Sequence, residues 1–209
     1  MQALQLGDIA PNFSINSSQG SINLHHYLGS SWGVLYSHPA DYTPVCTTEL
    51  GRTAQLQHEF DARNVKVLAL SIDAASSHLS WISDINETQN CTVQFPIIAD
   101  EAKEVAIQYG MLHPNASVHA TVRSVFIIDP NKKVRLTMTY PMNVGRNFAE
   151  ILRVIDALQL ADKETVSTPA DWQLGQPVIV PPSVPTDAAS AKYGHRLTIV
   201  KPYLRYVQL

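Results

Sequence analysis

Two hydrophobic patterns alternate along this chain. Short, nearly continuous apolar runs predict strands that are buried on both faces, and apolar residues that recur every three or four positions predict amphipathic helices. The predicted strands are 34–36, 65–72, 95–98, 124–128 and 134–138, with an edge strand at 21–24. The predicted helices are 50–63, 76–85, 101–109 and 147–160, with a polar loop at 86–92. Strands that alternate with helices, then a hairpin and a closing helix, indicate an α/β sandwich.

The composition changes near Val166. Prolines at positions 169, 177, 181, 182 and 185 break regular structure there, and the last part, 197–200 and 204–207, is strand-like. We therefore predict two domains, residues 1–165 and 166–209. A unit of roughly 40 residues is too small to build a sound core alone, so it must pack on the first domain or on another subunit.

A thiol lies on the turn between the strand at 34–36 and the helix that follows it. Thr43 and Pro44 form a helix-start signature, with Thr as N-cap and Pro at the first helical position. This places Cys46 in the first helical turn, where unpaired N–H groups and the helix dipole favour a nucleophilic thiolate. Most free cysteines are instead small buried hydrophobes, and that alternative stays open for Cys46 on this evidence.

The spacing Pro39-x-x-x-Thr43-x-x-Cys46 resembles the active-site motif of the peroxiredoxins, which are thiol peroxidases. The longer string at 37–50 is similar to that of the one-cysteine, peroxiredoxin-6 group, and the resemblance extends over residues 7–206. It implies a thioredoxin-like sandwich, with a central mixed sheet and flanking helices. It also implies a small C-terminal domain that packs across a homodimer.

Breaking a peroxide O–O bond with a thiolate is a displacement in which negative charge develops on the departing oxygen. The site needs an ionised sulfur, donors aimed at the peroxide oxygens, and shelter from water. Cys46 supplies the sulfur. Thr43, three residues earlier, can place its hydroxyl beside it, and backbone N–H groups of the first turn can hold an oxygen. Pro39 has no N–H to compete for the thiolate and can form a wall of the pocket.

The resemblance also supplies the missing cation. It assigns this role to Arg123, whose forked guanidinium would favour the thiolate and hydrogen-bond the peroxide. His38 and Arg146 are further candidates, and His38 is equally compatible with a structural role. Glu49 and Arg146 are expected to pair and orient Arg123.

The product of the first step is a sulfenic acid on Cys46. The chain has two cysteines, and none follows Cys91, which matches no resolving-cysteine context. We expect Cys91 to be a bystander and an external thiol to reduce Cys46; glutathione with a transferase, thioredoxin and ascorbate stay open. The prediction is a one-cysteine peroxidase that reduces hydrogen peroxide and small organic hydroperoxides, with antioxidant and redox-homeostasis roles and without cofactor.

Composition limits which partners and which cellular compartment are expected. The 209 residues are 45% hydrophobic and 16% charged, with a net charge of −3, which gives no basic footprint for nucleic acid or anionic membrane. No apolar run approaches the ~18 residues of a membrane span, and the amino terminus has no targeting pattern. Unpatterned cysteines suit a reducing compartment, so we expect a cytoplasmic protein. The eight histidines show no metal-ligand spacing, so no metal is predicted.

Two alternatives belong to other functional classes. Gly29-Ser30-Ser31-Trp32-Gly33 matches the Gly-x-Ser-x-Gly elbow of serine hydrolases, with His25 or His26 as a candidate base for a phospholipase activity. That elbow needs a strand before its serine and a helix after it. Here the order is reversed, and no convincing acidic partner is found. The second alternative is a redox sensor or holdase whose partner detects oxidation of Cys46.

Overall fold

The computed structural model describes residues 4–209, and the chain forms two compact units that divide between Phe148 and Ala149. This division groups the long helix α6 (Phe148–Glu164) almost entirely with the second unit. The boundary at 165/166 that the proline-rich composition suggested instead leaves the helix with the first domain. The domain limits stay a prediction.

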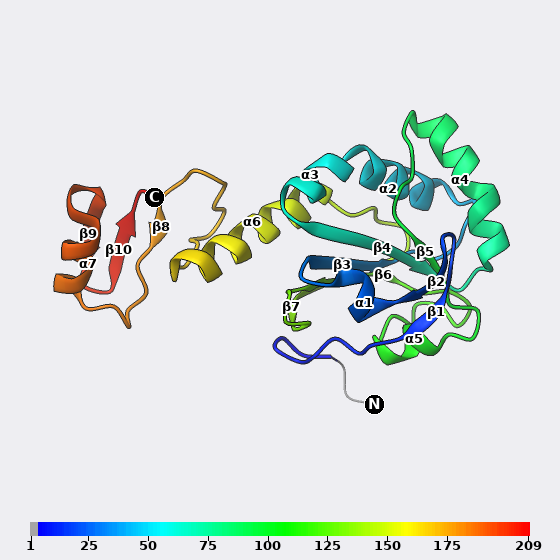
Figure 1. Ribbon diagram of the computed structural model, residues 1–209, viewed down its shortest axis with the longest axis horizontal. Coiled ribbons are helices and arrows are strands. Elements are labelled where there is room, and N and C mark those ends of the chain that lie inside the picture. Colours follow the sequence, from blue (N-terminus) through cyan, green and yellow to red (C-terminus); the bar gives the residue numbers. More distant parts are fainter. Residues whose placement is uncertain (1–3) are drawn as a thin grey trace. The chain divides into compact units, whose positions relative to one another are not determined.

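A seven-stranded mixed sheet forms the centre of the first unit (Figure 1), in the order β2-β1-β5-β4-β3-β6-β7. Its strands are β1 (Ser14–Ser17), β2 (Gly20–Asn23), β3 (Trp32–Ser37), β4 (Val65–Ser71), β5 (Ile97–Ala99), β6 (Arg123–Ile128) and β7 (Val134–Tyr140). The three central strands β3, β4 and β5 are parallel, and β6 runs antiparallel to β3. This is the thioredoxin-like sandwich that the resemblance implied.

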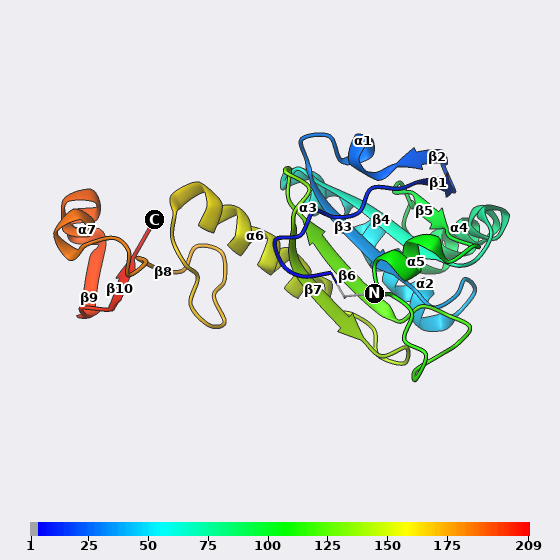
Figure 2. The same ribbon diagram turned by 90° about the horizontal axis from the view of Figure 1, so that it is seen from below.

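Helices cover both faces of this sheet (Figures 1 and 2). The covering helices are α1 (Leu24–Leu28), α2 (Pro44–Gln55), α3 (Gln57–Ala62), α4 (Ala75–Gln89) and α5 (Glu104–Gln108). Apolar residues of α1 and α5 pack with Leu35, Leu68 and Leu70 on one face. The alternate residues of β3 point to the opposite face, where Tyr36 contacts Thr53 of α2.

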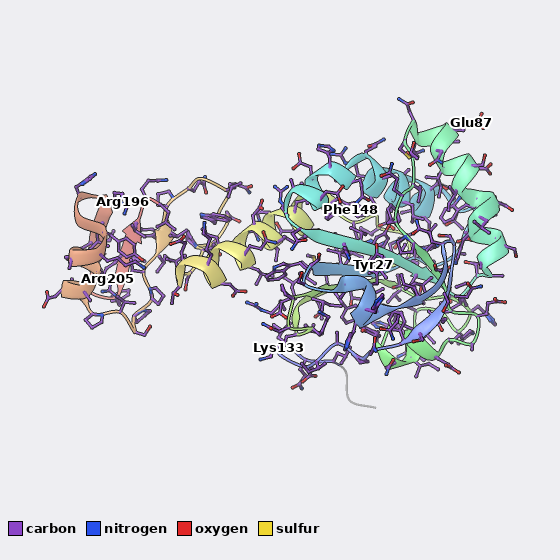
Figure 3. All side chains as sticks on the ribbon, in the orientation of Figure 1. Tyr27, Glu87, Lys133, Phe148, Arg196 and Arg205 are labelled. Carbon is purple, nitrogen blue, oxygen red and sulfur yellow. The ribbon has the colours of Figure 1, made fainter. Side chains whose placement is uncertain are left out.

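The second unit has its own small core. Strands β8 (Val178–Ile179), β9 (Leu197–Lys201) and β10 (Leu204–Val207) pair in the order β8-β10-β9, and α7 (Thr186–Tyr193) accompanies them. Trp172 and Tyr193 are buried in this core. Arg196 and Arg205 lie in the same unit (Figure 3), and strand β9 forms one edge of its sheet with Ile199 and Val200 half exposed.

All four helix predictions were wrong in their limits, and the helix predicted at 147–160 runs on to Glu164 as α6. The helix predicted at 50–63 is two helices, because Leu56 leaves helical geometry between α2 and α3. The loop predicted at 86–92 is helical to Gln89, and Asn90 ends α4 in a left-handed conformation that Asn tolerates. The helix predicted at 101–109 forms only as α5. There Lys103 has a φ of 61° and the Asp100 carboxylate accepts the N–H groups of Val105 and Ala106.

Candidate active site

The turn that carries Cys46 lies between β3 and α2, beside the start of β6. Strand β3 is buried along its whole length, which fixes the point where the chain leaves the sheet after Ser37. Helix α2 begins as predicted, with Thr43 in an extended N-cap conformation and Pro44 at the first helical position. Cys46 therefore lies in the first turn of α2, and none of its surface is exposed.

A guanidinium faces the buried sulfur. The Nη1 group of Arg123 donates to the Cys46 Sγ at 3.3 Å and to Glu49 Oε2 at 2.7 Å. Its Nε and Nη2 groups both donate to the carbonyl oxygen of Met142, at 2.9 and 2.6 Å. Arg123 is the first residue of β6, which pairs with β3, so sheet register brings it to the end of β3 where the turn begins. Only 2% of Arg123 is exposed.

Glu49 joins Arg123 to a second buried arginine. It lies one helical turn after Cys46, and its carboxylate accepts hydrogen bonds from Nε, Nη2 and the backbone N–H of Arg146. The Nη1 group of Arg146 donates to the carbonyls of Ser37 and Ser124, the last residue of β3 and the second of β6. The guanidinium lies over the ring of Tyr36, 4.5 Å from its centroid. The N–H donors of Arg146 thus bond to residues of α2, β3 and β6, the elements that surround Cys46.

The other predicted residues are less directly placed. Pro39 is buried in the turn. The hydroxyl of Thr43 donates to the carbonyl of Ala40 at 2.9 Å and makes no capping hydrogen bond, so its donor is not aimed at the sulfur. His38 is completely buried, and its Nε2 contacts Asp41 Oδ1 at 3.0 Å rather than the cysteine. Burial lowers the pKa of His38 against the opposing effect of the Asp41 hydrogen bond.

Sequence reasoning missed three contributors to this region. The Met142 carbonyl is a backbone group in the loop after β7, and no side-chain motif reveals it. Tyr36 was assigned only to a buried strand, and its position under Arg146 depends on the fold. Asp41 lies inside the motif itself, and its His78 partner comes from α4, 37 residues away.

Cys91 has different surroundings. It is half-buried after the end of α4, and its thiol lies 3.8 Å from the carbonyl of Ile85 and 3.9 Å from Asn86 Oδ1. Burial raises the pKa of the Cys91 thiol. Both cysteines are free thiols in the structure.

The residues proposed for a serine hydrolase do not form a catalytic arrangement. Ser31 precedes β3, and its hydroxyl donates to Asn64 Oδ1 at 2.8 Å. The Nε2 of His25 contacts the carbonyl of Ala10 at 2.7 Å. Within residues 4–209, no hydrogen bond joins Ser31 to a histidine, so its hydroxyl has no base. In the same residues, no helix is both long and apolar enough to cross a bilayer.

Comparison with known proteins agrees with this geometry. Residues 6–137 match the AhpC/TSA family, so the fold is that of a peroxiredoxin. Residues 157–195 match the C-terminal domain of 1-Cys peroxiredoxin. The chain belongs to the 1-Cys, peroxiredoxin-6-type peroxiredoxins, and it is a thiol peroxidase.

Relatives match over nearly the full chain. A 1-Cys peroxiredoxin of Dictyostelium discoideum is 51% identical, over 97% of this chain and 84% of the relative. Peroxiredoxin-6 of Gallus gallus is 48% identical, over 99% and 98% of the two chains. A solved yeast mitochondrial 1-Cys peroxiredoxin has a TM-score of 0.93 and 52% identity, over 99% of this chain and 100% of that chain. Its description concerns thiol resolution through glutathione and thioredoxin systems.

Proposed function

We propose that this protein reduces hydrogen peroxide and small organic hydroperoxides through a sulfenic acid on Cys46. The observation that carries the proposal is the 3.3 Å contact between the Arg123 guanidinium and the Cys46 sulfur in a site that excludes water. A guanidinium is always protonated, so it stabilises negative charge on the sulfur and can donate to a peroxide oxygen.

The charge balance of the buried cluster supports a thiolate. Arg123 and Arg146 bring two positive charges, and Glu49 brings one negative charge, all of them nearly inaccessible to water. A buried charge without a partner is costly. An ionised Cys46 makes the sum zero, so the cluster is neutral only when the nucleophile is a thiolate.

The reaction proceeds in two stages. The thiolate attacks one peroxide oxygen, the O–O bond breaks, and the departing oxygen leaves as water or an alcohol after it takes up a proton. Sulfur is oxidised by two electrons and becomes the sulfenic acid. An external thiol then attacks this sulfur, water leaves, and a mixed disulfide forms. A second thiol releases Cys46 and carries away the disulfide product.

Each residue of the motif and its surroundings takes a role in this proposal. Arg123 stabilises the thiolate and the departing oxygen, and Glu49 and Arg146 orient Arg123. Thr43 turns its hydroxyl from Ala40 toward the incoming peroxide, and Pro39 forms a wall of the pocket. His38 supports the turn from its buried position.

The reductant, assembly and compartment follow as parts of the same proposal. The description of the yeast relative favours glutathione or thioredoxin systems as the reductant. The half-exposed apolar residues on the edge strand β9, such as Ile199 and Val200, favour a homodimer in which the second unit packs on a partner. Two free cysteines suit the cytosol, although the solved yeast relative is mitochondrial.

Steady-state peroxide consumption tests the proposal, with a glutathione or thioredoxin system as electron donor. Cys46→Ser is expected to abolish turnover, and Cys91→Ser, the matched control, is expected to retain it. Turnover that survives in Cys46→Ser would overturn the assignment. Oxidation of Cys46 without turnover under any of these reductants would favour the sensor function instead.

A further inference from the structure

A second buried polar network lies on the turn that carries Cys46. Asp41 is only 7% exposed, and its Oδ2 accepts hydrogen bonds from Ser77 Oγ and His78 Nδ1, both at 2.7 Å. Its Oδ1 contacts His38 Nε2. Its backbone N–H donates to Asp73 Oδ2 at 3.0 Å. Asp41 therefore ties the turn to helix α4 and to the loop after β4.

This network stabilises the start of α2, where the usual side-chain capping hydrogen bond is missing. Thr43 makes no side-chain capping bond, and Tyr42 has a φ of 54°, a left-handed conformation that is strained for a non-glycine residue. A strained turn persists only where its surroundings hold it. The hydrogen bonds of Asp41 hold this turn from outside, together with the backbone bonds of His38 to Leu70 and Thr121, directly before the helix that carries Cys46.

The hydrogen bonds also fix the proton on His38. Burial by itself raises the pKa of Asp41, but the hydrogen bonds from His38 and His78 outweigh burial and hold that pKa below its usual range. An ionised carboxylate only accepts, so the proton of neutral His38 must be on Nε2. Its Nδ1 is buried and has no hydrogen-bond partner among the described residues.

Hydrogen bonding also explains why these side chains cluster. Ligand atoms of His38, Asp41 and Asp73 lie within 4.8 Å of one another, a spacing that metal sites also show. However, Asp73 Oδ2 already accepts from the Asp41 N–H and from Ser71 Oγ, and both Asp41 oxygens have donors. Asp41 Oδ1, Asp41 Oδ2 and Asp73 Oδ2 are thus already occupied by hydrogen bonds, while Nδ1 of His38 has no partner among the described residues.

We propose that Asp41 is a positioning residue for the peroxidase reaction. Through Ser77, His78 and His38 it sets where the sulfur of Cys46 lies relative to Arg123. The site then has two separate supports, because Glu49 and Arg146 hold the guanidinium while Asp41 holds the turn that bears the sulfur. This inference rests on the proposed function of Cys46.

The test measures the rate of sulfenic acid formation with stoichiometric hydrogen peroxide. Asp41→Asn is expected to slow it by at least about tenfold, since a misplacement of about 1 Å at a reacting centre costs on the order of 100-fold. Asp129→Asn makes the same chemical change at another buried carboxylate, in the turn after β6, and is expected to match the wild type. Nitrogen NMR should find His38 protonated on Nε2 in the wild type and in mixed tautomers in Asp41→Asn.

A milder pair of variants keeps the test decisive where Asp41→Asn does not fold. Ser77→Ala removes one donor to Asp41 and is expected to slow the reaction roughly threefold, and Ser77→Thr is expected to restore it. Folded Asp41→Asn or Ser77→Ala within twofold of wild type would overturn the proposal. So would an unchanged His38 tautomer in Asp41→Asn, or a slowed Ser77→Ala that Ser77→Thr does not rescue. A wild type that forms no sulfenic acid would instead overturn the proposed function.

Discussion

The two cysteines of this chain lie in opposite chemical environments. Cys46 is fully buried in the first turn of α2 and contacts the Arg123 guanidinium. Cys91 is more exposed, but it follows the end of α4, and its thiol has weak contacts to a carbonyl and an amide oxygen. Burial raises the pKa of the Cys91 thiol, and no cation offsets that effect in the described contacts.

This difference shows that access alone does not select the reactive thiol. The less accessible sulfur is the one with a positive charge beside it, and the more accessible one lies beside acceptors that disfavour a thiolate. Chemical reactivity is therefore expected to follow charge rather than exposure. The four predictions below test this contrast, from the largest effect to the smallest.

Removal of the Arg123 guanidinium should remove most of the difference in reactivity between Cys46 and Cys91. We expect Arg123→Met to lower the rate of Cys46 oxidation by hydrogen peroxide about 100-fold, because it removes a positive donor from a water-excluded site. Stopped-flow kinetics measures this rate. Arg135→Met on β7 removes an arginine that pairs with Asp129 and is the matched control. An Arg123→Met rate within threefold of wild type would contradict the prediction.

Removal of the shared carboxylate should weaken both stability and reactivity. Glu49→Gln leaves two buried guanidinium groups with only the Cys46 thiolate as counter-charge, which should cost about 3 kcal/mol of unfolding free energy. Arg123 loses an anchor, so the peroxide rate should fall about tenfold. Denaturant titration and stopped-flow kinetics measure the two effects. Glu59→Gln, which breaks a partly exposed pair with Arg63, should change neither by much. Equal stability losses in the two variants would refute this assignment.

His38 gives the turn of Cys46 a pH dependence. Its pKa in the folded protein is lowered by burial, so below about pH 6.5 the unfolded chain binds a proton that the folded protein does not. Above that pH, His38 costs the folded protein no unfolding free energy. As the pH falls toward the pKa of His38 in the folded protein, the unfolding free energy decreases. Between about pH 7 and pH 5.5 the unfolding free energy should fall more steeply in wild type than in His38→Asn. Parallel slopes would count against a buried neutral His38.

Changes at Cys91 should have the smallest effect. Cys91→Ser is expected to leave the peroxide rate and the reductant dependence within error of wild type, because no described contact links Cys91 to the site of Cys46. Competition kinetics at several peroxide concentrations provides the measurement. If Cys91→Ser slows or loses the reduction of oxidised Cys46, Cys91 has a resolving role, and the contrast between the two cysteines does not hold.

The sequence predicted most of this arrangement because its signals are local. Thr43 and Pro44 indicated the start of α2, and continuous apolar runs indicated the central strands. The contacts of Glu49 with Arg123 and Arg146 join distant segments and were expected from the family resemblance rather than from a local pattern; they are present, while their catalytic roles remain predictions. The small C-terminal strands at 197–200 and 204–207 were also found, as β9 and β10.

What could not be predicted depends on contacts between distant segments. The Asp41–His78 pair joins residues 37 positions apart, and a histidine on a helix does not reveal its partner. The carbonyl of Met142 acts as a backbone group, so its side chain carries no signal. The break at Leu56 has no glycine or proline to mark it.

Intact-mass analysis after one equivalent of hydrogen peroxide shows which of the two cysteines is oxidised, and in what form. We expect the wild type and Cys91→Ser each to gain one oxygen atom, peptide mapping to place it on Cys46, and Cys46→Ser to gain none. Loss of two hydrogens in the wild type, or oxygen on Cys91 while Cys46 remains reduced, would contradict this expectation.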